Sequence, residues 1–548
     1  MANEDVIIVG AGLSGLVAAV EAADRGRSVL VVDQEGRQNL GAQAFWSMGG
    51  LFMVDTPEQR RMGIRDNREL AMADWMGTAA FDRAEDAWAR RWAEAFVDFA
   101  AGGMRDWLHG LGMRWFPIVG WAERGGGTAT GHGNSVPRFH LTWGVGPGVI
   151  EPFVDRALAH EADGRLTFGF RHRVDRVVSR NGTATGIAGA TLAEDGAPIG
   201  VPTSREVTGD FEIDGATIVV ASGGIGGNLE MVRRNWPRDR LGEPPAKMIA
   251  GVPAHVDGHM LSVAEAAGGH LVNEDRMWHY TEGIRNHDPV WPDHGVRILP
   301  GPSSLWLDAT GHRLPAPCFP GFDTMQTLKT ILATGHGHSW FVATSTIVKK
   351  EFALSGSEQN PDFAEKSWRR VIRERLLSKT AAPAVEAFKE KGEDFVISSD
   401  LDGLLRGMDQ VGGGGVLDHE RVRAEVAARD AQMDNAFSKD AQVMAIHAMR
   451  NHRGDRIMRT AKPHRLTDPA HGPMVAVRLN VLTRKTLGGL QTDLEGRMLG
   501  ADGTAVSGLY ACGEAAGFGG GGYNGWNALE GTFLGGCLFS GRVVGRAV

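Results

Sequence analysis

Cysteine is scarce in this sequence. The 548 residues include only Cys318, Cys512 and Cys537. Their number is odd and no two form a C-x-x-C pair, so the sequence predicts neither a disulfide framework nor a zinc site. Such a chain suits a reducing compartment. Because a strand pattern begins at Val6, leaving no room for a signal peptide, we expect a cytoplasmic location.

Long apolar runs and clusters of basic residues are also missing. No segment approaches about 18 uninterrupted apolar residues, which predicts no membrane span. The net charge of −8 excludes a bulk attraction to nucleic acid or to anionic membranes. A hydrophobic content of 42% and a charged content of 23% are typical of a globular chain with sizeable cores. The length suggests two to four domains.

The best-defined motif lies near the N-terminus. An apolar, β-branched run over residues 6–9 predicts a buried parallel strand and leads directly into G-x-G-x-x-G. Gly10 permits the tight turn, Gly12 lets the backbone approach a pyrophosphate, and Gly15 lets the next helix pack closely on the strand. The N-terminus of that helix favours the phosphate charge.

A second predicted strand, residues 28–32, ends at Asp33. A carboxylate about 20 residues past the glycines is where the ribose of a dinucleotide is bound. The alternative is an ordinary βαβ unit with a Gly-rich turn. The complete strand–turn–helix–strand context favours the dinucleotide site.

Two further Gly-rich stretches indicate contact with a larger cofactor. Residues 41–50 combine small side chains with the pair Gly49 and Gly50, which lets a backbone lie flat against a planar ring. Residues 216–228 read as a buried strand that runs into a Gly-rich turn. In a doubly wound sheet, such turns line the ligand crevice.

These motifs, taken in order, resemble those of the FAD-dependent fumarate reductase/succinate dehydrogenase flavoprotein superfamily, and most of all its 3-ketosteroid dehydrogenase-like branch. The similar stretches are S-x-G-G at 47–50, V-V-A-S-G-G-x-G-G-N at 219–228, D-G-x-M at 257–260, L-G-G at 487–489 and L-Y-A-C-G-E at 509–514. The resemblance implies an α/β fold with a Rossmann-like FAD-binding domain of the GR2 type. That domain is split in sequence, over residues 1–260 and 470–548. An α+β capping domain, residues 261–469, is inserted between the two parts.

The resemblance also implies the FAD contacts. They are Gly10, Ala11, Gly12, Leu13, Ser14, Gly15, Asp33, Gln34, Ala42, Gln43, Ser47, Gly49, Gly50, Val174, Ala221, Ser222, Gly223, Asp257, Gly513, Glu514, Asn527, Ala528 and Leu529. Asn527 to Leu529 are expected to start the final helix, whose dipole would stabilise the reduced flavin. Membrane enzymes of the superfamily attach FAD through a His shortly before the Gly pair. Residues 43–47 contain no His, so we predict non-covalent FAD.

The catalytic residues are less well defined. Fumarate reductases clamp two carboxylates with His and Arg, but the Gly-rich loop at 518–526 contains no basic residue. It holds Tyr523 instead, and ketosteroid dehydrogenases use Tyr residues for proton transfer and carbonyl binding. We therefore predict Tyr523 for one of these roles, with Tyr280 or His279 as its partner, while Arg313 faces substrate. The alternatives are a Tyr packed under the loop, a structural His and a surface turn. No metal site is predicted.

The predicted activity is FAD-dependent oxidation or reduction of a CH–CH bond. The favoured substrate is a 3-ketosteroid or similar apolar cyclic ketone, or the matching enone in reverse. One alternative is fumarate-type reduction of a small carboxylate at an anion site of His279, Arg313, Arg484 and Lys485. Another is a flavoprotein for electron transfer or docking without turnover. The electron acceptor and the oligomeric state are left open.

Overall fold

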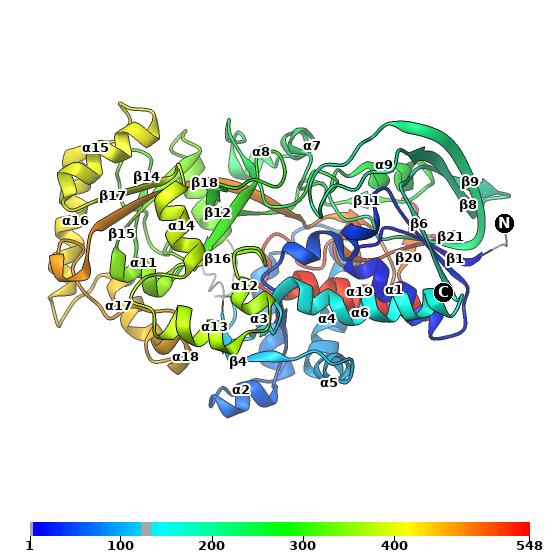
Figure 1. Cartoon of the computed structure of the whole chain (residues 1–548), viewed down its shortest axis with the longest axis horizontal. Helices are drawn as coiled ribbons and strands as arrows, with labels where there is room; N and C mark the ends of the chain where they lie inside the picture. Colours follow the sequence, from blue (N-terminus) through cyan, green and yellow to red (C-terminus); the bar gives the residue numbers. More distant parts are fainter. Residues whose placement is uncertain (1–3, 122–132) are drawn as a thin grey trace.

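The computed structural model describes residues 4–121 and 133–548. Figure 1 shows an elongated molecule in which both termini lie at one end, beside the first sheet. The main strands of this sheet follow the order β20-β21-β9-β1-β2-β6. Their bounds are β1 Glu4–Val9, β2 Val29–Asp33, β6 Leu166–Phe170, β9 Val207–Val220, β20 Arg497–Leu499 and β21 Ala505–Ala511. Strands from both ends of the chain therefore share one sheet. The strands β7 (His172–Arg180) and β8 (Thr183–Leu192) extend it through β9.

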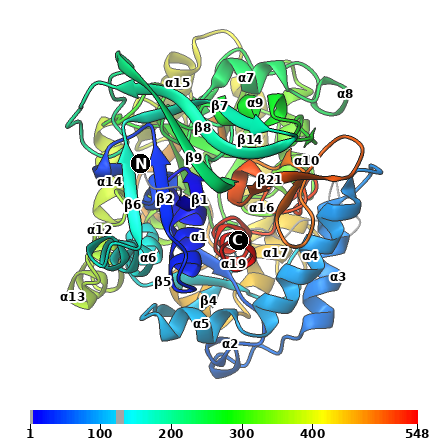
Figure 2. The ribbon, with the colours of Figure 1, turned by 90° about the vertical axis from the view of Figure 1, so that its right-hand side faces the viewer.

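The centre of the first sheet is parallel and buried. β1 pairs in parallel with β2 on one side and with β9 on the other. The Val and Ile side chains of β1 and β2 are buried, as the apolar runs predicted. The helix α1 (Leu13–Ala23) connects β1 to β2, and the C-terminal helix α19 (Thr532–Ala547) packs against α1 (Figure 2).

Small residues set the close approach of α1 and α19. A Cβ on Gly541 would lie 2.5 Å from the Ser14 carbonyl oxygen, and a Cβ on Gly545 would lie 2.5 Å from that of Ala18. A larger residue at either position would force the two backbones apart. Other helices beside this sheet are α3 (Arg68–Ala79), α4 (Asp86–Ala101), α5 (Met104–Gly110) and α6 (Val145–Ala162).

A second sheet forms the other half of the molecule. Its order is β14-β15-β18-β12-β13-β16, and these neighbours are antiparallel. The bounds are β12 Met277–Arg285, β13 Gly295–Leu299, β14 Leu305–Asp308, β15 His338–Thr344, β16 Ala353–Leu354 and β18 Met474–Thr486. Its helices include α10 (Thr324–Leu332), α11 (Ser345–Glu351), α14 (Pro383–Lys391), α15 (Leu401–Gly412), α16 (His419–Met433), α17 (Ala441–Met449) and α18 (Arg453–Met458). An α/β fold with a second, antiparallel-sheet domain is thus confirmed.

The strand β18 differs from the expected domain division. Residues 470–548 were assigned to the FAD-binding part, but β18 pairs with β12 and β15 of the second sheet. Most of its residues are buried, because neighbours cover both of its faces. By strand pairing, the chain returns to the first sheet only at β20.

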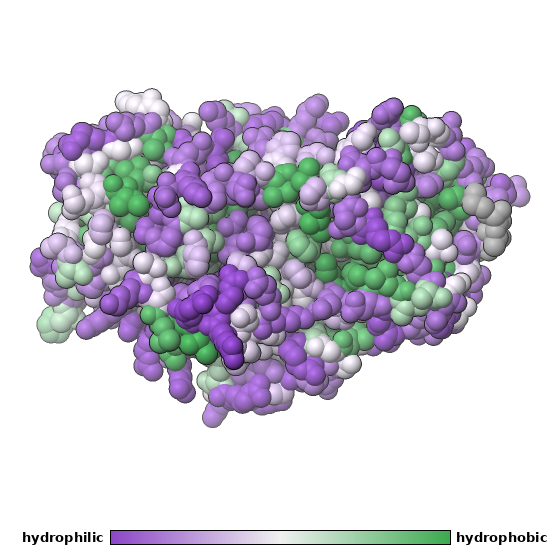
Figure 3. All heavy atoms as spheres, viewed as in Figure 1, coloured by the Kyte–Doolittle hydropathy of each residue, from purple (hydrophilic) through white to green (hydrophobic). Residues whose placement is uncertain are grey.

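Two large apolar clusters and one small sheet complete the fold. One cluster surrounds the first sheet and α19, and the other fills the second half. The small sheet contains β3 (Gly50–Phe52), β4 (Trp115–Gly120) and β5 (Phe139–Thr142). Hydrophilic residues dominate the face in Figure 3, with apolar residues gathered in a few places. Within the described ranges, no helix is both long and apolar enough to cross a bilayer.

Candidate active site

A crevice of about 1060 Å³ runs along the carboxyl ends of the first sheet. It is bordered by Asp33 at the end of β2, Gly10 after β1, Ala221 after β9 and Glu514 after β21. Because these strands are neighbours in the order β21-β9-β1-β2, the crevice crosses this edge of the sheet. Ligands of open α/β sheets bind at such an edge.

The strand-to-helix turn in the crevice has room for a pyrophosphate. Gly10 has φ +114°, and a Cβ there would lie 2.5 Å from the Ala221 carbonyl oxygen, so only glycine fits. A Cβ on Gly12 would meet only the Cβ of Ala42, at 3.6 Å. No described side chain caps the N-terminus of α1, and its first N–H groups are suited to phosphate oxygens.

Asp33 occupies the position expected for a ribose-binding carboxylate. Its Oδ2 accepts a 2.7 Å hydrogen bond from the Ala11 N–H, and its Oδ1 accepts one of 2.8 Å from the Glu35 N–H. Burial raises the pKa of this carboxyl above its usual range. The two backbone bonds hold the group in place, and each oxygen can accept a further bond from a ribose hydroxyl.

At the other end of the crevice, the side chains of Gln43 and Glu514 are hydrogen-bonded to each other. The Gln43 Nε2 donates to Glu514, whose Oε1 accepts a 2.7 Å bond from the Thr486 N–H. The Gln43 Oε1 is buried and has no hydrogen-bond partner within residues 4–121 and 133–548. An orphaned buried acceptor costs free energy unless a ligand N–H or O–H reaches it. These residues fit a polar ligand such as a flavin.

Most of the predicted FAD contacts line this crevice. They are Gly10, Gly12, Leu13, Ser14, Asp33, Gln34, Ala42, Gln43, Val174, Ala221, Ser222, Gly223, Asp257 and Glu514. The predicted residues Ala11, Gly15, Ser47, Gly49, Gly50, Gly513, Asn527, Ala528 and Leu529 do not line it. Gly49 and Gly50 serve packing, because a Cβ on them would strike the Val145 backbone and the Phe139 ring.

The expected start of the final helix is wrong. Asn527 to Leu529 precede the helix, and the Asn527 Nδ2 donates to the Thr78 carbonyl oxygen. The N-cap is Gly531, with φ +91°, a conformation that favours glycine. The helix α19 therefore begins at Thr532, and Phe533 and Leu534 of its first turn line the crevice instead.

Lys485 is the one basic side chain at this end of the crevice among the described lining residues. It lies on β18, beside the Phe533 ring. It forms no ion pair with a described carboxylate. Burial lowers its pKa to about 8. The sequence analysis places Lys485 only in the alternative anion site, whereas the structure places it in the lining of the crevice.

Tyr523 lies in the apolar core and lines neither this crevice nor the cleft described below. It is fully buried, and its ring packs on Trp75 at 5.0 Å between centroids. Its hydroxyl donates to the Thr532 carbonyl oxygen. This position does not fit the predicted role in proton transfer. The alternative reading of a ring packed under the Gly-rich loop agrees with the structure.

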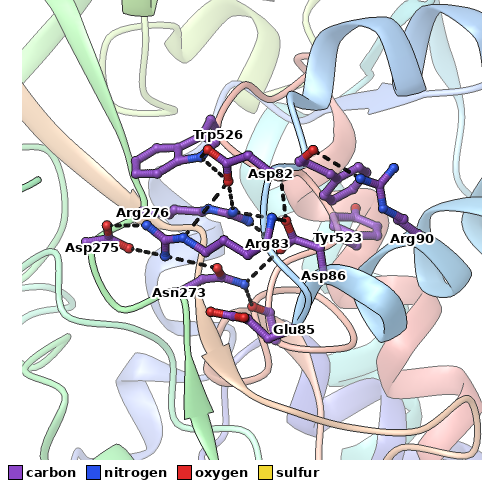
Figure 4. Close-up of polar contacts among 12 residues, drawn as sticks. Asp82, Arg83, Glu85, Asp86, Arg90, Asn273, Asp275, Arg276, Tyr523 and Trp526 are labelled. Atoms are coloured by element: carbon purple, nitrogen blue, oxygen red, sulfur yellow. Dashed lines mark hydrogen bonds and ion pairs between the residues drawn. The ribbon is translucent and has the colours of Figure 1, made fainter. Parts of the chain in front are cut away.

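An ion network holds the Gly-rich loop in place. Figure 4 shows Arg276 between Asp82 and Asp86, and Arg83 against Asp275. Asn273, in the same network, donates to the Gly521 carbonyl oxygen of the loop. Three guanidinium groups also lie over the Trp526 ring; they belong to Arg83, Arg240 and Arg276. The network fixes the loop to α4 and β12.

Arg313 does not face the site. Its guanidinium forms a bidentate pair with Asp440, at 2.6 and 3.0 Å, and also bonds Gln442. His279 is buried against the Trp236 ring, and burial lowers its pKa to about 3. Of the four residues of the fumarate-type alternative, His279, Arg313, Arg484 and Lys485, only Lys485 lines the crevice.

A second cavity, here called the cleft, lies between the two halves of the molecule. Its empty volume is about 2010 Å³. Its lining is mixed, and the apolar part comes from the small sheet and from segments around β13 and β16: Met48, Phe116, Phe139, Leu141, Leu299, Phe352 and Phe363. Met48 belongs to the stretch 43–50, whose first residues line the crevice. One short segment thus borders both cavities.

Four buried residues, here called the polar cluster, come together on β12, β13 and the segment before α19: Tyr280, Glu282, Arg297 and Glu530. The Arg297 Nη1 lies 2.7 Å from the Glu530 Oε1, and its guanidinium carbon lies 3.8 Å from the Tyr280 ring centroid. The Trp278 Nε1 also donates to the Glu530 Oε1, at 3.3 Å. Burial, then the Glu530 charge, raises the pKa of Tyr280. The Glu282 Oε2 and Arg297 Nε have no hydrogen-bond partner in the described chain.

None of these four residues lines the crevice or the cleft, but the cluster lies close to both in the chain. Glu530 is separated from α19 only by Gly531, and Phe533 of that helix lines the crevice. Arg297 lies two residues before Leu299, which lines the cleft. Sequence reasoning missed Arg297, Glu282 and Glu530, since no local motif marks them.

Comparison with known proteins agrees with these features. A model of the FAD binding domain family matches residues 5–534. The chain is 57% identical to a KsdD-like steroid dehydrogenase of Mycobacterium tuberculosis, a match that covers 99% of this chain and 95% of that protein. Identity to a KsdD-like steroid dehydrogenase of Mycolicibacterium smegmatis is 58%, over 97% and 96%. The resemblance predicted from the motifs is confirmed.

Solved structures show the same fold. The open conformation of a flavocytochrome c3 fumarate reductase matches with a TM-score of 0.65 at 18% identity, over 100% of this chain and 78% of that one. A 3-ketosteroid delta1-dehydrogenase from Sterolibacterium denitrificans matches with a TM-score of 0.65 at 14% identity, over 100% and 99%.

Proposed function

This chain belongs to the FAD binding domain family, and from that premise we propose that it oxidises or reduces a CH–CH bond next to the carbonyl of a 3-ketosteroid or similar apolar cyclic ketone. The observation that carries the proposal is a cleft with a partly apolar wall, bordered by Met48 of the same short stretch whose Gln43 and Ala44 line the crevice. Apolar pockets with a few polar groups at one point are typical of such ligands. The full-length similarity to KsdD-like steroid dehydrogenases supports the same substrate class.

The crevice residues would hold the FAD without a covalent bond. The turn at Gly10 and Gly12 would bind the pyrophosphate, and Asp33 the adenosine ribose. Gln43 would face the flavin with its orphaned oxygen. Bound FAD supplies a two-electron hydride acceptor or donor. Acid precipitation should release all of the flavin into the supernatant if no bond links it to the chain.

We assign proton transfer to the polar cluster. In dehydrogenation, the Tyr280 oxygen would accept a proton from the carbon next to the ketone, while the Tyr280 hydroxyl proton passes to Glu530. Glu530 is the proposed acceptor because its charge acts on Tyr280 and because Arg297 contacts both groups. The Arg297 guanidinium beside both groups would compensate the negative charge of the pair. In enone reduction the same proton would travel in reverse.

The test is anaerobic flavin spectroscopy on the FAD-loaded protein. Saturated 3-ketosteroids and 4-androstenedione are added to the oxidised enzyme, and enones to the reduced one. We expect Tyr280→Phe and Glu530→Gln to retain FAD but to slow the change in flavin absorbance by about 100-fold or more. Tyr510→Phe is the matched control, because Tyr510 lies on β21 of the first sheet and does not belong to the polar cluster. Unchanged rates in Tyr280→Phe would exclude the relay, and no response to any ketone would exclude the substrate class.

A further inference from the structure

One part of the cleft wall carries an unusual concentration of positive charge. Six of its basic residues come from α11, from the C-cap of α17, from α18 and from the segment that follows α18: Lys349, Lys350, Arg450, Arg456, Arg459 and Lys462. The carboxylates among the described lining residues are Glu374 and Asp455. In a chain with a net charge of −8, this local excess runs against the overall balance.

None of the six forms an ion pair with a carboxylate of the described residues. Several are instead held by backbone carbonyl oxygens. The Arg450 Nη1 donates to the Thr460 oxygen at 2.8 Å, and the Arg459 Nη2 donates to the Leu299 oxygen at 2.7 Å. Lys350 donates to the Ile457 oxygen. These bonds orient the cations, and the charges of Asp455 and Glu351 offset part of the effect of burial on the pKa of Arg459.

The pKa shifts of two of these basic residues also favour an anion-binding role. Burial and, after it, the charges of Arg450 and Lys349 lower the pKa of Lys350. Burial also lowers the pKa of Arg459, whose Nε has no hydrogen-bond partner in the part of the chain that the structure describes. Partly buried cations that repel one another destabilise a fold unless an anion joins them.

We propose that the substrate is an apolar ring ketone joined to a negatively charged tail, and that the tail binds this basic wall. The inference rests on the proposed function, because the ring system is placed in the apolar part of the cleft, near Met48 and Phe139. The tail would then extend toward Arg450 and Lys462. Carboxylate and phosphate oxygens are the groups that Arg and Lys recognise. The tail is therefore a side-chain carboxylate, or a phosphate-bearing carrier such as a coenzyme A thioester.

Three ligands with the same ring system test whether a negative charge on the tail strengthens binding. They are a 3-oxo-4-ene steroid with a side-chain carboxylic acid, the methyl ester of that acid, and its coenzyme A thioester. Dissociation constants are measured on the FAD-loaded protein by the perturbation of the flavin spectrum. We expect at least one anionic ligand to bind 10-fold or more tightly than the ester, and its affinity alone to fall with added salt.

Two exposed cations allow a variant that should fold normally. Lys349→Gln/Lys462→Gln removes two charges that make no ion pair in the described chain. We expect this variant to bind the anionic ligand 10-fold or more weakly than the wild type does, and to bind the ester with unchanged affinity. Lys247→Gln is the control, because Lys247 is exposed and does not line the cleft.

The outcomes separate this inference from the proposed function. Equal affinities for the acid, the ester and the thioester would refute the inference that the substrate has a charged tail. So would a loss of affinity for the anionic ligand in Lys247→Gln as large as that in Lys349→Gln/Lys462→Gln. Turnover of the ester without any charge preference would leave the proposed function standing and refute the inference. Charge-dependent binding without turnover would support the inference and refute the proposed reaction. A preference for the thioester over the acid identifies a phosphate-bearing tail, and binding of none of the three refutes the inference.

Discussion

The Tyr523 hydroxyl donates a 2.5 Å hydrogen bond to the carbonyl oxygen of Thr532, the first residue of α19. The same ring packs edge-on against Trp75 and Phe96, with centroids 5.0 and 5.4 Å away. The first turn of α19 lines the crevice through Phe533. Tyr523 therefore acts on the site indirectly, by fixing the position of a helix that borders it.

Replacement of Tyr523 by Phe tests this role. The variant keeps the ring and loses only the hydroxyl, so we expect a decrease of about 1 kcal/mol in the free energy of unfolding, measured in urea. Flavin reduction by substrate should stay within about twofold of the wild-type rate. A loss of 100-fold with FAD still bound would instead return Tyr523 to the list of catalytic residues.

The site residues that can be predicted are those whose role depends on neighbouring residues in the sequence. Gly10 and Gly12 were predictable because a turn next to a phosphate needs a strained backbone at one position and open space at the other. Asp33 followed from the length of a βαβ unit. These requirements depend on a few neighbouring residues, and the structure places all three in the crevice.

Arg297 and Glu530 could not be found in the same way. They are separated by 233 positions in the chain and meet only because β13 of the second sheet packs beside the segment that precedes α19. No periodicity or spacing records such a contact. The start of α19 was misplaced for a related reason, since Asn527 to Leu529 fit a helix start as well as Thr532 does. The left-handed backbone of Gly531 decides the boundary.

Substitutions of Gly12 and Gly15, the two glycines at the start of α1, should affect cofactor binding and folding separately. In Gly12→Ala the backbone is compatible, with φ −72°, and the new Cβ meets only an ordinary contact at 3.6 Å. The methyl group would nevertheless occupy the space proposed for the pyrophosphate. We expect a folded protein, by circular dichroism and urea unfolding, whose affinity for FAD is reduced by 100-fold or more.

Gly15→Ala is the comparison. A Cβ on Gly15 would lie 2.0 Å from the Gly10 carbonyl oxygen, a backbone atom that cannot move without displacing β1. This variant should lose several kcal/mol of stability or fail to accumulate as folded protein. Normal FAD binding by Gly12→Ala would contradict the placement of the pyrophosphate, and normal stability of Gly15→Ala would contradict the close packing of α1.

Lys485 should set the reduction potential of the bound flavin. If Asp33 binds the adenosine ribose as proposed, the flavin would occupy the opposite end of the crevice, where Lys485 lies. A cation there stabilises the extra negative charge of the reduced cofactor. We expect Lys485→Met to lower the two-electron midpoint potential by about 30 mV or more, which corresponds to about 1.4 kcal/mol. The potential is measured by anaerobic reductive titration against a reference dye.

The pH dependence provides a second readout for Lys485 that a loss of packing alone would not give. Burial lowers the Lys485 pKa to about 8, so the ammonium charge is present at neutral pH and is lost as the pH rises through that region. The potentials of wild type and Lys485→Met should therefore differ most below pH 7 and converge toward pH 9 or above. Lys247→Met, which changes an exposed lysine outside the crevice, should match wild type at every pH. A difference between wild type and Lys485→Met that stays constant over this range would mean that the charge of Lys485 does not act on the flavin.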